Sequence, residues 1–370
     1  MAKRIIYIDG LKGLCGIWVC LFHYLLAFAS FGYIGWESGV ADADKAAYYF
    51  RYFPYSILTN GSFPLYIFFA LIGFIPALHF FQTGSADGIR RQAVMRYFRL
   101  MPPVLACALI ASVVYLTSGF FSQELGALLD NNWDRAFYVV PLSLTGAFAN
   151  GIFYALWNGN CDYCSVLWCM NVIIFGSYLS YGILLFFGSF QRRFWLYGGL
   201  FLLSFAVPMY TAFLGGIVAA DLVVIHSGRP AAESRGWLLL SAGMVVGNFP
   251  EVWLPSGITV FSAYGIGAFL LLLGCSESRS IQSWLEKRWL VRAGVLSFAL
   301  ILVHFTILMS LSAWMFLKLC AIGISYGWAL TATVVLSVPV VWLAALVFES
   351  LVERPTERFS HWLFRKITGE

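Results

Sequence analysis

The chain has 370 residues, of which 61% are apolar and only 11% carry a charged side chain. A soluble domain carries about 25% charged residues, so this composition excludes a soluble globular protein and indicates one that crosses a membrane several times. The net charge of +5 is small, and we expect no nucleic acid among the partners. No stretch is polar for long enough to form a separate soluble domain, so we predict one integral membrane domain over residues 1–370.

Ten apolar segments are about long enough to cross a bilayer as helices. We therefore predict an all-α protein of the cell membrane, surrounded by lipid, with both termini in the cytoplasm. This orientation places most Lys and Arg residues in inward loops, as the positive-inside rule requires. The first segment is longer than the apolar core of a signal peptide, so we interpret it as an uncleaved span. The predicted spans cover residues 10–31, 56–81, 101–119, 165–189, 194–210, 211–226, 237–254, 257–275, 293–313 and 327–351.

The first predicted span contains a histidine. Lys12 and His23 are eleven residues apart, so on a helix they share one face and lie about 16 Å apart along its axis. Lys12 would then lie near the membrane surface and His23 near the bilayer midplane, where an ionisable group is costly and usually functional. A neutral imidazole can act as a general base. The alternatives are a histidine that only hydrogen-bonds in the core and a lysine that extends to the surface.

Two arginines stand at the inner end of the third span. Arg96 and Arg99 are three residues apart, so on a helix they project together, shortly before Pro102. Paired guanidinium groups bind phosphates through forked hydrogen bonds, which suits a nucleotide or a pyrophosphate. An anchor that contacts lipid headgroups explains the same spacing equally well.

The segment 136–157 is apolar, but counting it as a span would move Arg192 and Arg193 to the outside. We therefore predict a re-entrant or interfacial element on the extracytoplasmic side. The following pair, Cys161 and Cys164, would also face outside, where a local disulfide is one alternative. A single CxxC pair predicts no metal site.

Two further ionisable residues lie near the end of the chain. His304 is inside the ninth span, either as part of a site or as a hydrogen-bonding link between helices. Glu353 follows the tenth span, and Pro355 two residues later predicts that the helix ends there. The Glu353 carboxylate either pairs with an arginine of the site or is solvated at the helix end.

Several short motifs, in the same order along nearly the whole chain, resemble acyltransferase family 3, the ten-span membrane O-acyltransferases. The family opens with an Asp-Gly-Leu-Arg-Gly pattern followed by a histidine, which is similar to Asp9-Gly10-Leu11-Lys12-Gly13 leading to His23. The further matches are Phe68-Phe69-Ala70-Leu71-Ile72-Gly73-Phe74, Arg96 and Arg99 before Pro102, Leu167-Trp168-Cys169-Met170, Leu302-Val303-His304 and Glu353-Arg354-Pro355.

Three positions depart from the family pattern. Lys12 replaces the usual arginine, which keeps the charge but loses the bidentate geometry. Ile72 stands in place of a serine, and Ile173 stands where members often have a glutamate. These departures leave open a family member that binds its substrate without turnover.

The resemblance implies an enzyme that moves an acyl group, with acetyl as our first expectation, from cytoplasmic acyl-coenzyme A to a hydroxyl of a glycan, glycolipid or small molecule. Acyl-coenzyme A is then a co-substrate, and we expect no bound cofactor and no metal. The alternative from another class is a transporter or flippase of an anionic or lipid-linked metabolite, which also uses ionisable groups at the midplane. The implied site has His23 and Lys12 as catalytic residues, Arg96 and Arg99 at the donor, and Asp9, Trp168, His304 and Glu353 as further candidates.

Overall fold

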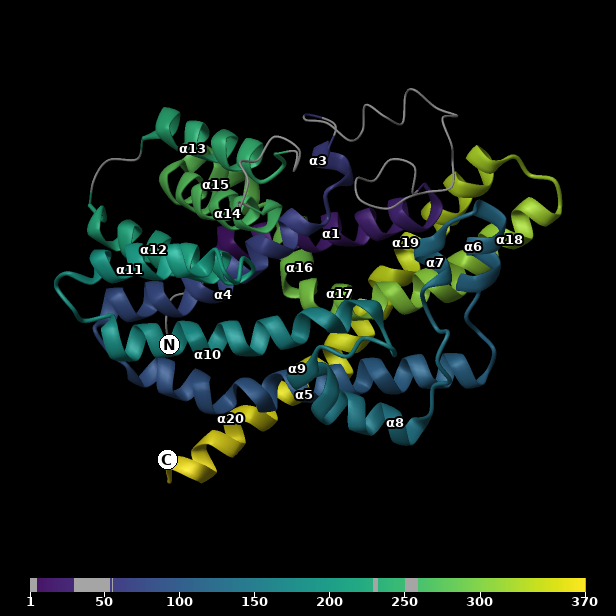
Figure 1. The fold of residues 1–370 in the computed structure, drawn as a ribbon, viewed down its shortest axis with the longest axis horizontal. Coiled ribbons are helices and arrows are strands. Elements are labelled where there is room, and N and C mark those ends of the chain that lie inside the picture. The colour runs from purple at the N-terminus through teal and green to yellow at the C-terminus, as the bar shows by residue number, and fades with distance from the viewer. Residues whose placement is uncertain (1–4, 30–53, 55, 229–231, 250–258, 370) are drawn as a thin grey trace. The chain divides into compact units, whose positions relative to one another are not determined.

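The computed structural model describes residues 5–29, 54, 56–228, 232–249 and 259–369. These residues are mostly helical and contain no strand (Figure 1), which confirms the all-α prediction for them. Seven helical stretches are long and apolar enough to cross a membrane, as expected for a membrane protein. They are Ile6–Phe28, Ser62–Thr83, Asp87–Leu116, Ser165–Phe187, Val260–Glu277, Ser297–Ala321 and Tyr326–Thr368. The total of ten spans and the cytoplasmic termini stay predictions.

Three predicted spans form shorter helices. They are α11 (Arg193–Ser204), α12 (Tyr210–Ile225) and α13 (Glu233–Val246), with 12, 16 and 14 residues. A straight helix needs about 20 residues to cross the hydrocarbon core, so these three fall short. The predicted spans also include residues 30–31, 250–254 and 257–258, which lie outside the described residues.

The chain divides into two compact units. The first unit comprises Met1–Cys15, Tyr52–Arg96 and Val172–Val295, and the second comprises Gly16–Arg51, Tyr97–Asn171 and Leu296–Glu370. Three long helices, α1 (Ile6–Phe28), α5 (Asp87–Leu116) and α10 (Cys169–Phe187), each contribute residues to both units. The assignment of the whole chain to one functional domain stays a prediction.

Closely packed helices form the first unit. Its α4 (Ser62–Thr83) packs against α12, and α12 and α13 pack against α14 (Val260–Glu277) (Figure 1). A Cβ atom at Gly73 would collide with the Phe213 carbonyl, and one at Gly216 would collide with the Ala70 carbonyl. Small residues at such contacts let membrane helices approach closely. The glycine of the Phe68–Phe74 motif therefore has a packing role in α4. The short α3 (Ser56–Thr59) precedes this helix.

The start of α1 packs in the same way against α15 (Arg279–Leu285) and α16 (Arg288–Val295). A side chain at Gly10 would collide with the Leu285 carbonyl, and one at Gly294 would collide with the Asp9 carbonyl. Helix packing is thus a sufficient reason for the glycine at the second position of the Asp9–Gly13 motif.

In the second unit, α17 (Ser297–Ile307) packs against α19 (Tyr326–Phe348) and against η3 (Ser165–Trp168). A π-turn, η5 (Leu308–Ser312), joins α17 to α18 (Ala313–Ala321), which contacts α6 (Ser122–Leu129) (Figure 1). A chain of buried hydroxyls connects α1, η5 and α19. The Tyr24 hydroxyl lies 3.0 Å from Ser312 Oγ, which donates to Ser337 Oγ at 2.8 Å.

The predicted helix end at Glu353 is wrong. The helix continues from α19 through a second π-turn, η6 (Glu349–Glu353), into α20 (Arg354–Thr368). Pro355 lies in the first turn of α20, where the missing N–H and the fixed φ of proline are tolerated.

The segment 136–157 begins irregularly and then forms α8 (Leu144–Ala149), η2 (Asn150–Tyr154) and α9 (Ala155–Asn158). None of these pieces is among the seven candidate spans. Its re-entrant or interfacial position stays a prediction.

Candidate functional site

Two of the predicted site residues meet in the second unit. His23 on α1 and His304 on α17 are 281 positions apart in the sequence, yet Nε2 of His304 lies 3.1 Å from Nδ1 of His23. The two ring centroids are 4.9 Å apart, and His304 is completely buried. The two histidines therefore form one pair. Whether they belong to a site or link two helices is thus one question for both residues.

Backbone carbonyls determine which nitrogen of each ring carries the proton in the neutral pair. Nδ1 of His304 lies 2.9 Å from the Leu300 carbonyl oxygen, which can only accept, so this nitrogen is the donor and Nε2 is the acceptor. Nδ1 of His23 faces two acceptors, the Val19 carbonyl at 2.9 Å and Nε2 of His304, so it also carries its proton. The lone pair of His23 is therefore on Nε2, and this atom has no hydrogen-bond partner among the described residues.

Aromatic rings surround the His23 imidazole. Trp133 stacks on it with 6.1 Å between ring centroids, and Phe305 and Phe22 contact it edge-on at 5.9 and 5.4 Å. These contacts fix the orientation of the ring, which is partly buried. We did not predict Trp133 or Phe305 as site residues, because a single aromatic residue in an apolar chain carries no distinctive sequence signal.

A short helix, α7 (Asn132–Arg135), holds Trp133 in this position. The Asn131 side chain donates to the carbonyls of Leu26 and Ala27 at 2.8 and 3.2 Å and accepts from the Trp133 backbone N–H at 3.0 Å. It therefore caps the end of α1 and the start of α7 at once. The Asn-Asn-Trp-Asp sequence contains a recognisable N-cap, but its burial against α1 depends on the tertiary fold.

Asp134 is a buried carboxyl next to this cap. It is completely buried, and its Oδ2 accepts from Asn131 at 2.9 Å. Its Oδ1 has no hydrogen-bond partner among the described residues. Burial raises the pKa of Asp134 to about 8, against the smaller lowering by Asn131, because a charged carboxylate is poorly solvated there.

A second pair of predicted residues meets in the first unit. Nζ of Lys12 lies 3.3 Å from Oδ1 of Asp9, three residues earlier on α1. Both side chains are mostly buried. Lys12 thus has an anionic partner on its own helix.

Arg99 and Glu353 belong to one charged cluster of the second unit. Arg99 forms an ion pair with Glu357 at 3.3 Å, and both side chains are at least half exposed. Glu353 interacts electrostatically with Arg99, Glu349 and Glu357. Its Oε1 is buried without a hydrogen-bond partner in the described part of the chain. The expected pairing of Glu353 with an arginine is therefore electrostatic, without a direct hydrogen bond.

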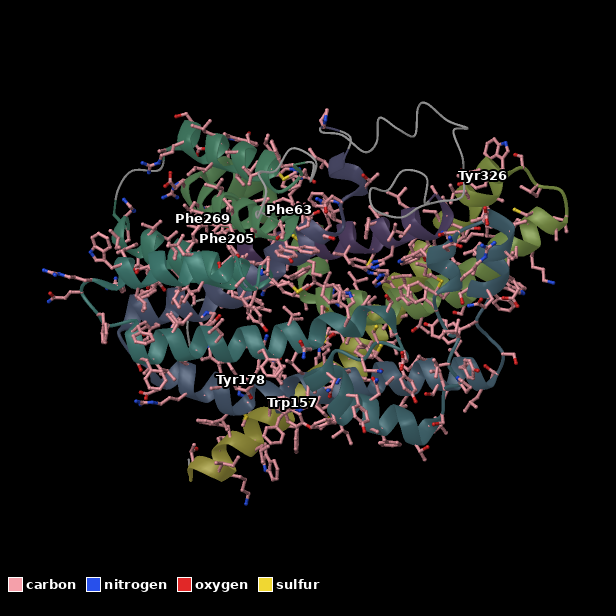
Figure 2. All side chains as sticks on the ribbon, viewed as in Figure 1. Phe63, Trp157, Tyr178, Phe205, Phe269 and Tyr326 are labelled. Carbon is pink, nitrogen blue, oxygen red and sulfur yellow. The ribbon has the colours of Figure 1, made fainter. Side chains whose placement is uncertain are left out.

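The remaining predicted residues lie in other surroundings. Arg96, on the part of α5 in the first unit, interacts electrostatically with Tyr178 of α10, a residue labelled in Figure 2. Trp168 ends η3 with 37% of its surface exposed. Cys161 and Cys164 are both free thiols in the structure. Among the described residues, no group of His, Cys, Asp and Glu is arranged to hold a metal ion.

The chain matches no known protein family, no curated protein and no solved structure. The resemblance to acyltransferase family 3 therefore rests on the ordered motifs alone.

Proposed function

We propose that this protein is an integral membrane O-acyltransferase, which moves an acyl group from acyl-coenzyme A to a hydroxyl of a glycan, glycolipid or small molecule. The observation that best supports the proposal is the histidine pair. His23 Nε2 carries a lone pair, and it has no partner among the described residues. A base of this kind must come within hydrogen-bond distance of the hydroxyl that it activates.

The reaction follows from this tautomer. The acceptor hydroxyl donates to His23 Nε2, and its oxygen attacks the thioester carbonyl while the proton moves to Nε2. The tetrahedral intermediate collapses, the carbon–sulfur bond breaks, and the coenzyme A thiolate takes the proton from His23. His23 is transiently an imidazolium, whose Nδ1–H donates to Nε2 of His304 at 3.1 Å. His304 is then the orienting partner, in the role of the third member of a catalytic triad.

The donor would bind through its phosphates. Arg96 and Arg99 would supply forked hydrogen bonds to phosphate oxygens. Arg99 must leave Glu357 for this, which costs little because exposed ion pairs contribute about 0–1 kcal/mol. The protein would act in the cell membrane with cytoplasmic acyl-coenzyme A.

The experiment uses the purified full-length protein in lipid nanodiscs, with labelled acetyl-coenzyme A and a membrane extract as the source of acceptor. We expect coenzyme A thiol release together with an alkali-labile acetyl ester. His23→Ala should lower the rate about 10²–10⁴-fold, as expected for loss of a general base. The matched control is His226→Ala, because Nδ1 of His226 also lies close to the carbonyl four residues earlier, at 2.8 Å.

Two results would contradict the proposal. Near-normal ester formation by His23→Ala would give His23 a packing role. Absence of both thiol release and ester from the folded wild-type protein, with every acyl donor and acceptor extract offered, would favour the transporter or the non-catalytic alternative.

A further inference from the structure

Two buried thiols in the second unit share one backbone carbonyl. Sγ of Cys107 on α5 lies 3.3 Å from the Leu302 carbonyl oxygen, and Sγ of Cys164, just before η3, lies 3.9 Å from the same oxygen. Both cysteines are buried, and the two thiols interact electrostatically with each other. The proposed acyl transfer uses neither thiol.

We propose that Cys107 and Cys164 are a redox-active dithiol that closes to a disulfide, with Cys161 as the thiol through which a small disulfide oxidant enters. A disulfide requires a sulfur–sulfur distance of about 2.05 Å and a Cβ–Cβ distance of about 3.8 Å. The two thiols lie on one carbonyl oxygen, at 3.3 and 3.9 Å, so rotations of their side chains can bring the sulfurs together. This inference is independent of the proposed acyl transfer.

Cys161 provides the route for oxidation. It is only partly buried, whereas Cys164 and Cys107 are buried, and it interacts electrostatically with Cys164. An external disulfide RSSR reacts first with the Cys161 thiolate, which forms a mixed disulfide and releases RSH. Cys164 then attacks the Cys161 sulfur and releases the second RSH. Cys107 finally attacks the Cys164 sulfur and returns Cys161 as a free thiol, so two thiols are oxidised and one external disulfide is reduced.

Tyr138 supports the exchange at the buried end. It adopts a positive φ of 56°, a strained conformation for a residue with a bulky side chain. Its hydroxyl is buried without a partner among the described residues, and it interacts electrostatically with both Cys107 and Cys164. A phenol in this position can donate a hydrogen bond to the thiolate that forms during each attack.

Oxidation would also change the hydrogen bonds of α17. The Thr306 hydroxyl is buried without a partner in the described residues, although a threonine in a helix commonly donates to the carbonyl four residues earlier. For Thr306 that carbonyl is Leu302, which already faces the two thiols. A disulfide removes both S–H donors, so the Thr306 hydroxyl can take their place. Leu302 precedes His304 by two residues, so the redox state affects the hydrogen bonds of the helix that carries His304.

The test uses the folded full-length protein in nanodiscs and glutathione disulfide as the oxidant. Remaining thiols are alkylated, and peptides are mapped by mass spectrometry without reduction. We expect the loss of two thiols and a cross-linked peptide that joins Cys107 to Cys164. Cys161→Ser should slow its formation about tenfold without changing its identity, because the entry thiol is missing. The matched control is Cys275→Ser, because Cys275 is also buried and lies on α14 in the first unit.

Two outcomes would overturn the inference. One is a final product that joins Cys161 to Cys164 in the wild-type protein. The other is a full complement of thiols after treatment that readily oxidises the unfolded chain. Both outcomes are observed in the peptide map of the wild-type protein. The result therefore does not depend on whether Cys107→Ser folds. In a folded Cys107→Ser variant we expect oxidation to stop at the Cys161–Cys164 disulfide.

Discussion

Two buried polar clusters of this protein satisfy their hydrogen bonds to different extents. In the first unit, Arg193 donates to both carboxylate oxygens of Asp221 at 2.5 and 2.7 Å, and the Tyr197 hydroxyl donates to the same carboxylate at 3.2 Å. In the second unit, the histidine pair leaves His23 Nε2 without a partner among the described residues. Oδ1 of Asp134, the residue after Trp133, also has no hydrogen-bond partner among the described residues.

This difference indicates different roles. A cluster whose polar atoms all pair within the chain stabilises the fold, because its desolvation is compensated by its own hydrogen bonds. Unpaired polar atoms in a buried cluster carry a desolvation cost that an incoming ligand can relieve. Asp221, which is as deeply buried as His304, is thus a structural residue by its contacts, whereas the lone pair of His23 Nε2 is available to accept a hydrogen bond from a ligand.

The largest expected effect is on stability, in the structural cluster. Asp221→Ala leaves the Arg193 guanidinium without its bidentate partner, so we expect a loss of about 3–5 kcal/mol in the free energy of unfolding. Thermal unfolding in detergent measures it. The control is Asp87→Ala, which breaks an exposed ion pair with Arg90 and should cost at most about 1 kcal/mol. Similar losses in both variants would show that the cluster does not stabilise the fold.

The next effect is the pH dependence of stability at Asp134. Its folded pKa of about 8 lies above its unfolded value, so between about pH 4 and pH 8 the unfolded state releases this proton more readily and stability falls as pH rises. Asp134→Asn removes this dependence. At about 1.4 kcal/mol per pH unit over this range, we expect the variant to gain about 3.5 kcal/mol relative to wild type between pH 5 and pH 8.

Thermal unfolding at a series of pH values tests this expectation. The control is Asp130→Asn, because the Asp130 carboxylate is mostly exposed. If the curves of the wild type and of the Asp134→Asn variant stay parallel across the range, Asp134 is ionised in the folded protein.

The smallest effect separates orientation from packing at His304. His304→Ala removes the acceptor for His23 Nδ1–H, and we expect kcat for acyl transfer to fall about 10–10²-fold while KM for acyl-coenzyme A stays unchanged. His304→Gln restores an acceptor oxygen and should recover part of kcat. If the alanine and glutamine variants lose kcat equally, the imidazole of His304 acts through packing alone.

The sequence predicted the membrane helices better than the surroundings of the site. Helices such as α1 and α4 follow directly from long apolar runs, because a span must bury its backbone in lipid. Pro355 misled the prediction of a helix end because the helix continues through the π-turn η6 into α20 and places Pro355 in the first turn of α20. Local propensity alone does not contain that information.

For the site, the sequence indicated His23 and His304 separately, as ionisable groups inside apolar runs. Their contact bridges 281 positions and depends on how α1 packs against α17. Asn131 and Asp134 were missed because Asn-Asn-Trp-Asp is typical of a polar loop, and only the fold shows that two of its polar side chains are buried.

The π-turn η5 has a consequence for insertions and deletions. A π-turn contains one residue more than the α-helical turn that it replaces, and each residue of an α-helix adds about 100° of rotation. The side chains of α18, which follows Leu308–Ser312, are therefore rotated about the helix axis, compared with the positions they would have if α17 continued as a regular α-helix. Deleting a single residue there would restore regular winding and turn the whole of α18 by about 100°. Ser312 would leave Tyr24 and Ser337, while His304, on the preceding turns, would keep its place. The extra residue thus sets the register of α18 independently of the histidine pair.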